Sequence, residues 1–311
     1  MNKQKPLVLG IVGPTASGKT LFSMALARAM PVEIICMDSM QIYRGMDIGT
    51  AKPTRREQAL VPHHMLDLVS PDTGYSVAEY QQEAALAIEG ILHRKAMPLL
   101  VGGTGLYLWA LSNRLNLGNA PRSEEIRSRF EALLQQHGRE ALHQHLRRVD
   151  PLSADRLHPN DTRRVIRALE VYELTGQSIS RQQDTAERAP WSFQLYAPDW
   201  PRELLYQRIN ERVEQMFSSG LVEEVRTLLS EGVSPESQSM QGLGYKELLP
   251  LLAGQSTLVQ TVELLQRRTR NYAKRQLTWF RRDSRITWVP MPVEEDAFVT
   301  MVRKDIAQYE G

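Results

Sequence analysis

The chain has 311 residues, of which 42% are hydrophobic and 24% are charged, and its formal net charge is +2. These values are ordinary for a soluble globular protein, and the length allows one large domain or two smaller ones. The sequence excludes a membrane-spanning helix, since no apolar run reaches the roughly 20 residues required, and its single cysteine, Cys36, excludes an internal disulfide framework. The basic N-terminus leads into a short apolar stretch, which predicts a first strand and not a signal peptide. We therefore expect a cytoplasmic protein with no membrane partner.

The first predicted elements are a strand, a glycine-rich loop and a helix. Leu7–Val12 is a short apolar run typical of a buried strand, and residues 20–30 contain no Gly or Pro and predict a helix. Between them the sequence GPTASGKT fits the phosphate-loop pattern G-x-x-x-x-G-K-[ST], and this context disfavours a chance match. The loop residues are Gly13, Pro14, Thr15, Ala16, Ser17, Gly18, Lys19 and Thr20.

The phosphate loop has a definite chemistry. Its glycines let backbone N–H groups point into a concave nest, Lys19 supplies a full positive charge, and the Thr20 hydroxyl can ligate Mg²⁺. No residue of the pattern recognises an adenine base. The loop therefore predicts a bound diphosphate or triphosphate without deciding that it belongs to ATP.

Two further predicted strands end at polar residues. The runs 33–37 and 97–101 are apolar, and they are followed by Asp38 and by Gly102-Gly103-Thr104, with helical spacing between the runs. Alternating strands and helices predict a parallel α/β sheet, whose ligands lie beyond the carboxyl ends of the strands. We therefore expect the phosphate loop, Asp38 and Thr104 to meet at one site.

The spacing leaves the roles of Asp38 and Thr104 open. Asp38 could hold a metal, act as a general base, or be a turn carboxylate. Thr104 could donate to a substrate or belong to a tight turn. The segment 38–53 is polar yet contains Ile42, Tyr43, Met46 and Ile48, which favours a ligand-binding lining over a free loop.

The middle of the chain is predicted to be helical. Helices are indicated near residues 126–134 and 140–149, and a third follows Asn160 or Asp161 and ends at Gly176. No strand-like run is evident from 122 to 190. The predicted fold is therefore an α/β, P-loop-containing parallel-sheet core, residues 1–116 and 191–311, with a helical insertion domain at 117–190.

The last third predicts a strand at 195–198, helices at 202–219, 222–230 and about 256–282, and a strand at 285–289. Residues 266–285 hold eight Lys or Arg with aromatic residues between them, a pattern that suggests a phosphate-backbone partner. Composition alone slightly favours a solvated helix face. The pairs His63/His64 and His143/His145 lack the spacing of a zinc site and are expected at the surface, while Cys36 is expected in the core.

Six motifs occur in order: GPTASGKT, DSMQIYRGMDIGTAKP, LLVGGTGLY, HPNDTRRVIRALEVYELTG, QGLGYKEL and NYAKRQLTWFRR. Together, across residues 7–289, they resemble the bacterial tRNA dimethylallyltransferases. The resemblance implies that the loop holds the diphosphate of dimethylallyl diphosphate with Mg²⁺. It further implies that the acceptor is the exocyclic amine of the adenosine 3′ of the anticodon, in tRNAs that read codons starting with U.

The same resemblance implies roles for individual residues. Asp38 would accept a hydrogen bond from the amine and take its proton, while Lys19, Thr20 with Mg²⁺ and Arg212 would stabilise the departing diphosphate; Arg208 is the second choice for Arg212. The residues expected to contact tRNA are Asp38, Ser39, Met40, Gln41, Thr104, Arg127, Arg163, Arg164, Val165, Ile166, Arg167, Gln241, Gly242, Leu243, Gly244, Tyr245 and Lys246. The family also suggests a monomer that recognises the anticodon stem-loop.

Two other functions remain open at the level of sequence. An ATP-dependent P-loop kinase of a small metabolite would share the loop and the sheet but leave the basic helix unexplained. A non-catalytic RNA-binding module would explain the basic helix but not the phosphate loop. The sequence does not decide which tRNAs are modified or whether longer prenyl diphosphates are accepted.

Overall fold

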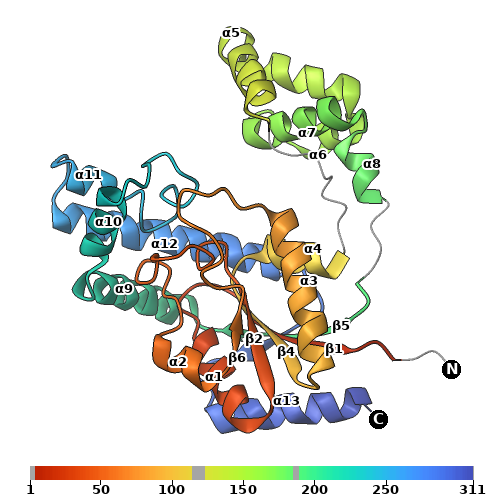
Figure 1. Cartoon of the computed structure of the whole chain (residues 1–311), viewed down its shortest axis with the longest axis vertical. Coiled ribbons are helices and arrows are strands. Elements are labelled where there is room, and N and C mark those ends of the chain that lie inside the picture. The colour runs from red at the N-terminus through yellow and green to blue at the C-terminus, as the bar shows by residue number, and fades with distance from the viewer. Residues whose placement is uncertain (1–3, 114–122, 185–188, 311) are drawn as a thin grey trace. The chain divides into compact units, whose positions relative to one another are not determined.

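The computed structural model describes residues 4–113, 123–184 and 189–310. The chain divides into two compact units, residues 1–109 with 190–311, and residues 110–189 (Figure 1). The predicted boundary at 116/117 lies outside the described residues. The first unit carries the sheet and the second contains only helices among its described residues, so the predicted α/β class is confirmed.

The sheet of the first unit is entirely parallel. Within the described residues it has six strands in the order β3-β2-β4-β1-β5-β6. Their bounds are β1 Leu7–Val12, β2 Val32–Met37, β3 His63–His64, β4 Met97–Gly102, β5 Ser192–Asp199 and β6 Ile286–Pro290. Strands β1 and β2 are buried at every position, which explains their continuous apolar sequences, because both faces of a parallel sheet are covered.

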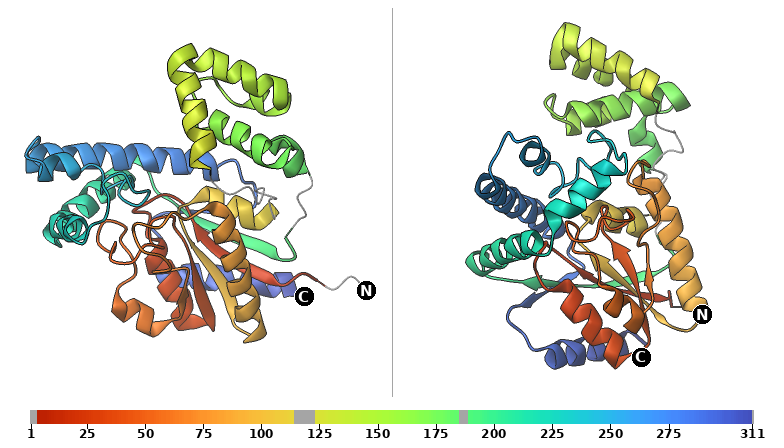
Figure 2. Two further views of the ribbon diagram at one scale, coloured as in Figure 1. Left: turned by 45° about the horizontal axis from the view of Figure 1, so that its top comes forward. Right: turned by 60° about the vertical axis from the view of Figure 1, so that its left-hand side comes forward.

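Helices cover both faces of this sheet. The connection through α1 (Lys19–Ala29) runs from β1 to β2, and the connection through α3 (Val77–His93) runs the opposite way, from β3 to β4. Right-handed crossovers in opposite directions place the two helices on opposite faces (Figures 1 and 2). On the α3 face, the Tyr80 hydroxyl donates to the Cys36 carbonyl over 3.0 Å, and the Cys36 thiol is buried as expected.

The remaining helices of this unit are α2 Arg55–Leu60, α4 Gly105–Asn113, which runs into the second unit, α9 Arg202–Ser218, α10 Leu221–Ser230, α11 Leu249–Leu252, α12 Leu258–Phe280 and α13 Glu295–Glu310. Helix α13 packs beside α1, where the Phe22 and Phe298 rings lie 4.6 Å apart. Helix α12 packs against α9 and begins at Leu258, because Thr257 caps it in a capping box with Gln260. Among the described helices, none combines the length and apolar character that crossing a membrane requires.

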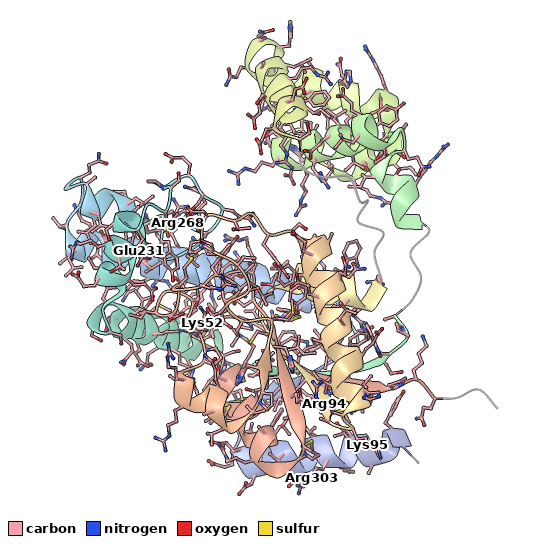
Figure 3. All side chains as sticks on the ribbon, viewed as in Figure 1. Lys52, Arg94, Lys95, Glu231, Arg268 and Arg303 are labelled. Atoms are coloured by element: carbon pink, nitrogen blue, oxygen red, sulfur yellow. The ribbon has the colours of Figure 1, made fainter. Side chains whose placement is uncertain are left out.

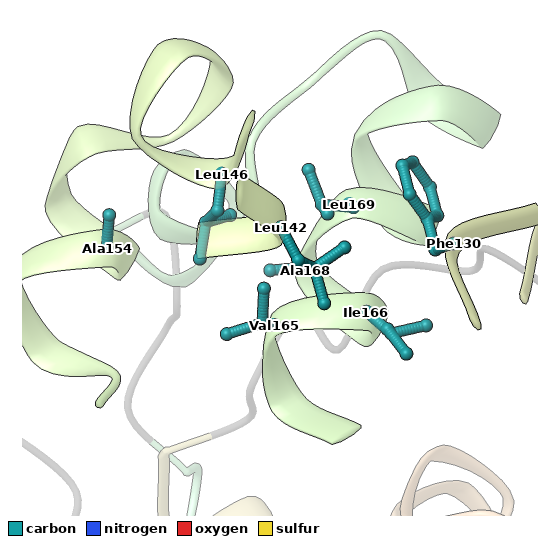
Figure 4. Close-up of a cluster of buried hydrophobic side chains, with 8 residues drawn as sticks. All are labelled: Phe130, Leu142, Leu146, Ala154, Val165, Ile166, Ala168 and Leu169. Atoms are coloured by element: carbon teal, nitrogen blue, oxygen red, sulfur yellow. The ribbon is translucent and has the colours of Figure 1, made fainter. Parts of the chain in front are cut away.

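The second unit contains α5 (Glu124–Val149), α6 (Pro151–Arg156), α7 (Thr162–Thr175) and α8 (Ile179–Asp184). Gly138 has a non-helical backbone inside α5 (φ 77°), so two helical stretches flank it, as the sequence predicts. Helix α7 ends at Gly176 in the left-handed conformation, which confirms the predicted terminal glycine. The core of this unit (Figure 4) consists of Phe130, Leu142, Leu146, Ala154, Val165, Ile166, Ala168 and Leu169.

One histidine prediction is wrong. His143, expected at the surface, is buried in the second unit, with its Nε2 3.0 Å from the Ala154 carbonyl oxygen and 2.8 Å from that of Leu157. It lies where α5 packs against α6, and its ring nitrogen is within hydrogen-bonding distance of carbonyl groups at the C-terminal end of α6. A buried polar side chain with backbone partners has a structural role, because it satisfies carbonyl groups that lack helical partners.

Candidate active site

Three loops meet at the carboxyl edge of the sheet. Val12 pairs with Gly102, and Gly102 pairs with Met37 on its other side. The phosphate loop, Asp38 and the glycine turn after β4 therefore begin side by side, as the strand order requires. A Cβ atom at Gly102 would lie 2.0 Å from the Met37 carbonyl oxygen, so this close approach of backbones needs glycine.

A cavity of about 750 Å³ opens at this edge. The phosphate loop, the segment after β2, helix α9 and helix α12 all contribute to its walls. Residues with polar groups on the walls include Thr15, Ser17, Lys19, Thr20, Asp38, Ser39, Gln41, Arg208, Arg212, Thr269, Tyr272 and Gln276. The predicted meeting of the phosphate loop with Asp38 is thus confirmed.

Three side chains from two segments that are distant in the sequence hold the phosphate loop. The Trp200 indole N–H donates to the Ser17 carbonyl over 2.9 Å, and Arg208 Nε donates to the Ala16 carbonyl over 3.0 Å. Gln276 Oε1 accepts from the Thr15 N–H over 2.9 Å. The loop is therefore preorganised, since its backbone is fixed before any ligand arrives.

The loop leaves two side-chain groups available for an anion. Lys19 Nζ donates to the Gly13 and Pro14 carbonyls over 3.1 and 2.6 Å. The buried Ser17 hydroxyl has no hydrogen-bond partner within the described residues. A phosphate oxygen could take both donors, since an unpaired buried hydroxyl is costly and a charged acceptor binds an ammonium more strongly than a carbonyl does.

Lys19, Arg212 and Asp38 interact electrostatically within the cavity. Burial, and then repulsion from Arg212, lowers the pKa of Lys19 to about 7, and Asp38 opposes this change. Burial also lowers the pKa of the Arg212 guanidinium, again opposed by Asp38. A bound anion would relieve the repulsion between the two cations, so this end of the cavity favours a diphosphate.

The segment 38–53 forms one wall and is tied down at several points. Asp38 Oδ1 accepts from the Met40 N–H over 2.9 Å, so Asp38 is a turn carboxylate as well as a cavity residue. The Ser39 N–H donates to the Thr104 hydroxyl over 3.1 Å. Gln41 Nε2 donates to the carbonyls of Thr50 and Ala51. Met40 lines the cavity, whereas Ile42, Tyr43 and Met46 are fully buried in the core and are not among its wall residues.

Glu224 of α10 fixes the same segment from outside. Its carboxylate accepts from the N–H groups of Asp47, Ile48 and Gly49 over 2.9, 2.7 and 3.0 Å. It also accepts from the Tyr245 hydroxyl over 2.7 Å. One half-buried carboxylate thus joins two segments, 38–53 and 241–246, that lie far apart in the sequence.

Lys52 braces the other end of the segment (Figure 3). Its buried ammonium donates to the Tyr43 carbonyl over 2.8 Å and forms ion pairs with Asp47 and Asp67 at 2.6 and 2.5 Å. A buried lysine is tolerated only when its charge is paired and hydrogen-bonded. The ammonium therefore fixes the course of the segment.

A protein-family model described as IPP transferase matches residues 41–283. The tRNA dimethylallyltransferase of Pelotomaculum thermopropionicum is 46% identical over 311 residues, an alignment that covers 99% of this chain and 97% of that protein.

The chain belongs to the IPP transferase family. The tRNA dimethylallyltransferase of Desulforudis audaxviator is 49% identical, covering 95% of this chain and 94% of that protein. Among solved structures, the full-length tRNA isopentenylpyrophosphate transferase of Bacillus halodurans is 43% identical with a TM-score of 0.73, covering 98% and 97% of the two chains. A eukaryotic dimethylallyltransferase acting on tRNA is 30% identical with a TM-score of 0.79, covering 92% of this chain and 74% of that one. The resemblance found in the sequence is thereby confirmed.

Several residues that the IPP transferase family led us to expect at the RNA are placed at or near the cavity. Gly242, Leu243 and Gly244 line it together with Met40, and a Cβ atom at Gly242 would lie 2.2 Å from Met40 Cε. Gln241 and Lys246 are exposed beside them. The Tyr245 side chain is fully buried and bonded to Glu224, so it does not face solvent, and contact of this residue with tRNA stays a prediction.

In the second unit the family-derived predictions divide between surface and core. Arg163 and Arg164 are exposed at the start of α7. The side chains of Val165 and Ile166 are 0% and 6% exposed and belong to the core, and the contact of these two residues with tRNA stays a prediction.

Arg127 and Arg167 both bind the buried carboxylate of Glu170. Arg127 does so with two hydrogen bonds of 2.9 and 3.0 Å, and Arg167 with one of 2.7 Å. Burial alone would raise the pKa of Glu170, but the hydrogen bonds from the two arginines outweigh it and lower the pKa to about 2. Their contact with tRNA stays a prediction, whereas their structural role is evident.

Sequence reasoning missed four residues that build the site: Trp200, Glu224, Tyr272 and Gln276. Trp200 directly follows β5, so the rule that singled out Asp38 and Thr104 could have found it. Gln276 lies inside the NYAKRQLTWFRR motif, but the local pattern gives no sign that it reaches the phosphate loop. Tyr272 lies in the same motif, which gives no sign that it lines the cavity, and Glu224 carries no local signal at all.

Proposed function

We propose that the chain transfers the dimethylallyl group of dimethylallyl diphosphate to the exocyclic amine of the adenosine 3′ of the anticodon. The acceptors would be tRNAs that read codons starting with U. The observation that supports this proposal is that Asp38, Lys19 and Arg212 line one cavity and interact electrostatically there. A base and a diphosphate cradle in a single cavity are what alkylation of an amine by a diphosphate ester requires.

Asp38 would act on the nucleophile. An adenine amine is a poor nucleophile because its lone pair is delocalised into the ring. The Asp38 carboxylate would accept a hydrogen bond from the amine and take its proton as the new C–N bond forms. Its Oδ1 is held by the Met40 N–H, which fixes the carboxylate beside the loop.

Lys19, Arg212 and the loop amides would stabilise the leaving group. As the C–O bond of the donor breaks, negative charge gathers on the diphosphate, and preorganised cations lower the cost of that charge by several kcal/mol, on the order of 3. Lys19 would exchange its two loop carbonyls for phosphate oxygens. The Ser17 hydroxyl would donate to the same group.

The Thr20 hydroxyl would hold Mg²⁺. Thr20 lines the cavity at the start of α1, and Asp38 lies on the same walls. Within the described residues there is no cluster of three or more His, Cys, Asp or Glu side chains, so an all-protein metal cage is not what this site offers. Bound Mg²⁺ would neutralise charge on the diphosphate oxygens, as it does where phosphates supply most of the ligands.

The acceptor base would enter from the side of Ser39–Gln41. An enzyme that alters a base must take it out of its stack, and the unstacked base needs a fitted pocket. Hydrogen bonds with Glu224, Lys52 and Thr104 hold that wall of the cavity in place. We also propose that the enzyme acts as a monomer in the cytoplasm, as the family and the single cysteine suggest.

The test is transfer of a labelled dimethylallyl group to unmodified tRNA with Mg²⁺ and no ATP. We expect label in tRNA and equimolar release of diphosphate. Labelling of a small molecule that depends on ATP, with none of tRNA, would support a kinase instead.

A further inference from the structure

A second hollow lies at the amino edge of the sheet, the edge opposite to the transferase cavity. Its volume is about 500 Å³, within the range of roughly 300–1,000 Å³ that is typical of small-molecule sites. Four segments of the first unit form its walls: residues 4–7, which lead into β1, residues 30–31 before β2, residues 92–97 before β4, and residues 303–309 of α13. None of its wall residues lines the transferase cavity, so the hollow is a separate site.

Hydrogen bonds join these segments. The Tyr309 hydroxyl of α13 donates to the Lys5 carbonyl over 2.7 Å. The Met97 N–H at the start of β4 donates to the Pro31 carbonyl over 2.9 Å. The walls are therefore held by the fold itself and do not need a ligand to order them.

The hollow is cationic. Its charged wall residues are Lys5, Lys95 and Arg303, and none of the described wall residues is an Asp or a Glu. Lys95 and Arg303 are exposed, and neither forms an ion pair within the described part of the chain. Both lie beside α13 (Figure 3). Arg303 donates to the Ala29 carbonyl at the end of α1, which leaves further N–H groups of its guanidinium for an anion.

The backbone of Lys95 is strained. Lys95 follows α3 with φ 60°, in the left-handed region, and its N–H donates to the Leu92 carbonyl over 3.0 Å in a Schellman motif. The same motif ends α10 at Gly232 and α11 at Gly254, and glycine adopts this conformation at no steric cost. A lysine where the chain elsewhere uses glycine lowers stability, and strain of this kind points to a function of the side chain.

The floor of the hollow is apolar. Leu7 is buried, and Met30, Leu92, Met97 and Ile306 are half-buried on its walls. A hydrocarbon placed against these side chains loses contact with water and is stabilised there. An inorganic anion would make no use of this surface, and its attraction to exposed cations is screened by salt. The walls therefore fit a molecule that has both an acidic head group and an apolar body.

We propose that the hollow binds a free amphiphilic organic anion, with its phosphate or carboxylate head beside Lys95 and Arg303 and its hydrocarbon chain on the apolar floor. The site lies at the opposite edge of the sheet from the phosphate loop, so its occupant does not compete with a diphosphate there. The proposal goes beyond the proposed function and does not depend on it.

Titration calorimetry of the full chain tests the proposal with three probes: decyl phosphate below its micelle concentration, inorganic phosphate and decanol. We expect decyl phosphate to bind at least about tenfold more tightly than either of the others, because only this probe uses both the cations and the floor. Inorganic phosphate that binds as tightly as decyl phosphate would overturn the proposal. So would binding to vesicles of anionic lipid without binding of dissolved decyl phosphate, since the occupant would then be a membrane.

Variants show whether the probe binds at this hollow. Lys95→Gly combined with Arg303→Ala should weaken binding of decyl phosphate by about tenfold or more, because the head group loses two charged donors. Lys304→Ala is the matched control, because Lys304 is an exposed cation on the same helix that does not line the hollow. This control should change the affinity by less than about twofold. Equal affinities of the wild type and the double variant would place the probe elsewhere and overturn the proposal.

Lys95→Gly alone separates binding from folding. Glycine removes the strain at φ 60°, so this variant should unfold at the same temperature as the wild type or a higher one, while it binds decyl phosphate more weakly. Thermal unfolding followed by circular dichroism gives the first value and calorimetry the second. A lower unfolding temperature would show that the lysine serves the fold, and this result would also overturn the proposal.

Discussion

Lys19 is the residue whose charge state most directly couples the site to pH. Burial and Arg212 lower its pKa to about 7 in the free protein. A bound diphosphate favours the charged form and therefore raises this pKa. Below pH 7 the lysine is already protonated, so binding needs no proton; above pH 7 binding must take one up.

We therefore expect the affinity for dimethylallyl diphosphate to fall above pH 7, by up to about tenfold per pH unit. Titration calorimetry in two buffers of different ionisation enthalpy, between about pH 6 and 9, measures the proton uptake. The Lys19→Met variant should bind more weakly and lack this uptake, and the difference between the two proteins removes the ionisation of the ligand itself. Equal proton uptake by wild type and variant would refute this role of Lys19.

At the scale of single elements, the segment 38–53 depends on Glu224. Its carboxylate accepts four hydrogen bonds, and hydrogen bonds to a charged group contribute about 1.5–3 kcal/mol each. In Glu224→Gln an NH2 group replaces one of the two accepting oxygens, so two of the four hydrogen bonds lose their acceptor. The segment 38–53 is then held less firmly. The phosphate loop keeps its hydrogen bonds with Trp200, Arg208 and Gln276.

Glu224→Gln is accordingly expected to raise KM for tRNA by about tenfold or more and to leave KM for the prenyl donor nearly unchanged. Steady-state kinetics with each substrate varied separately gives both values. Tyr245→Phe, which removes a single donor from the same carboxylate, should have a smaller effect in the same direction. Equal increases in both KM values would show that Glu224 supports the whole fold and not this segment.

The elements also show what the sequence could and could not predict. Asp38 and the phosphate loop were predictable because parallel strands place their carboxyl ends together, and residues that follow a strand are visible locally. Glu224 and Gln276 act through long-range contacts. The contact between Glu224 and Asp47 joins residues more than 170 positions apart in the sequence, and the contact between Gln276 and Thr15 joins residues more than 260 positions apart. No local pattern encodes such contacts. Val165 and Ile166 were expected at the RNA because a whole motif was carried over, although the helical spacing already marks their side chains as buried.

At the scale of the whole molecule, the second unit is built around a buried charge. Glu170 is fully buried and bonded to Arg127, Arg167 and the Ser123 N–H. Its pKa is lowered from 4.5 to about 2. A carboxylate whose pKa is depressed by folding stabilises the fold above its unfolded pKa, and this contribution is lost as pH falls through the folded value.

Stability of the full chain should therefore fall as pH decreases from about 4.5 towards 2, in part through Glu170. Glu170→Gln should lower the free energy of unfolding at pH 7 by up to about 3 kcal/mol, because two arginines lose their buried partner. The difference between wild type and variant should shrink in acid. Urea denaturation at several pH values, followed by circular dichroism, checks both expectations. A difference that does not depend on pH would contradict them.

The central claim is that one cavity binds the departing diphosphate while Asp38 accepts a proton from the adenine amine. Mass analysis of tRNA nucleosides after incubation with dimethylallyl diphosphate and Mg²⁺ tests it most directly. We predict a dimethylallyl-substituted adenosine with the wild type, and a loss of roughly 10²–10⁴-fold in its rate of formation with Asp38→Ala, which should still bind tRNA. An unmodified nucleoside pool with the wild type, or an Asp38→Ala variant that forms the product at the wild-type rate, would contradict the account.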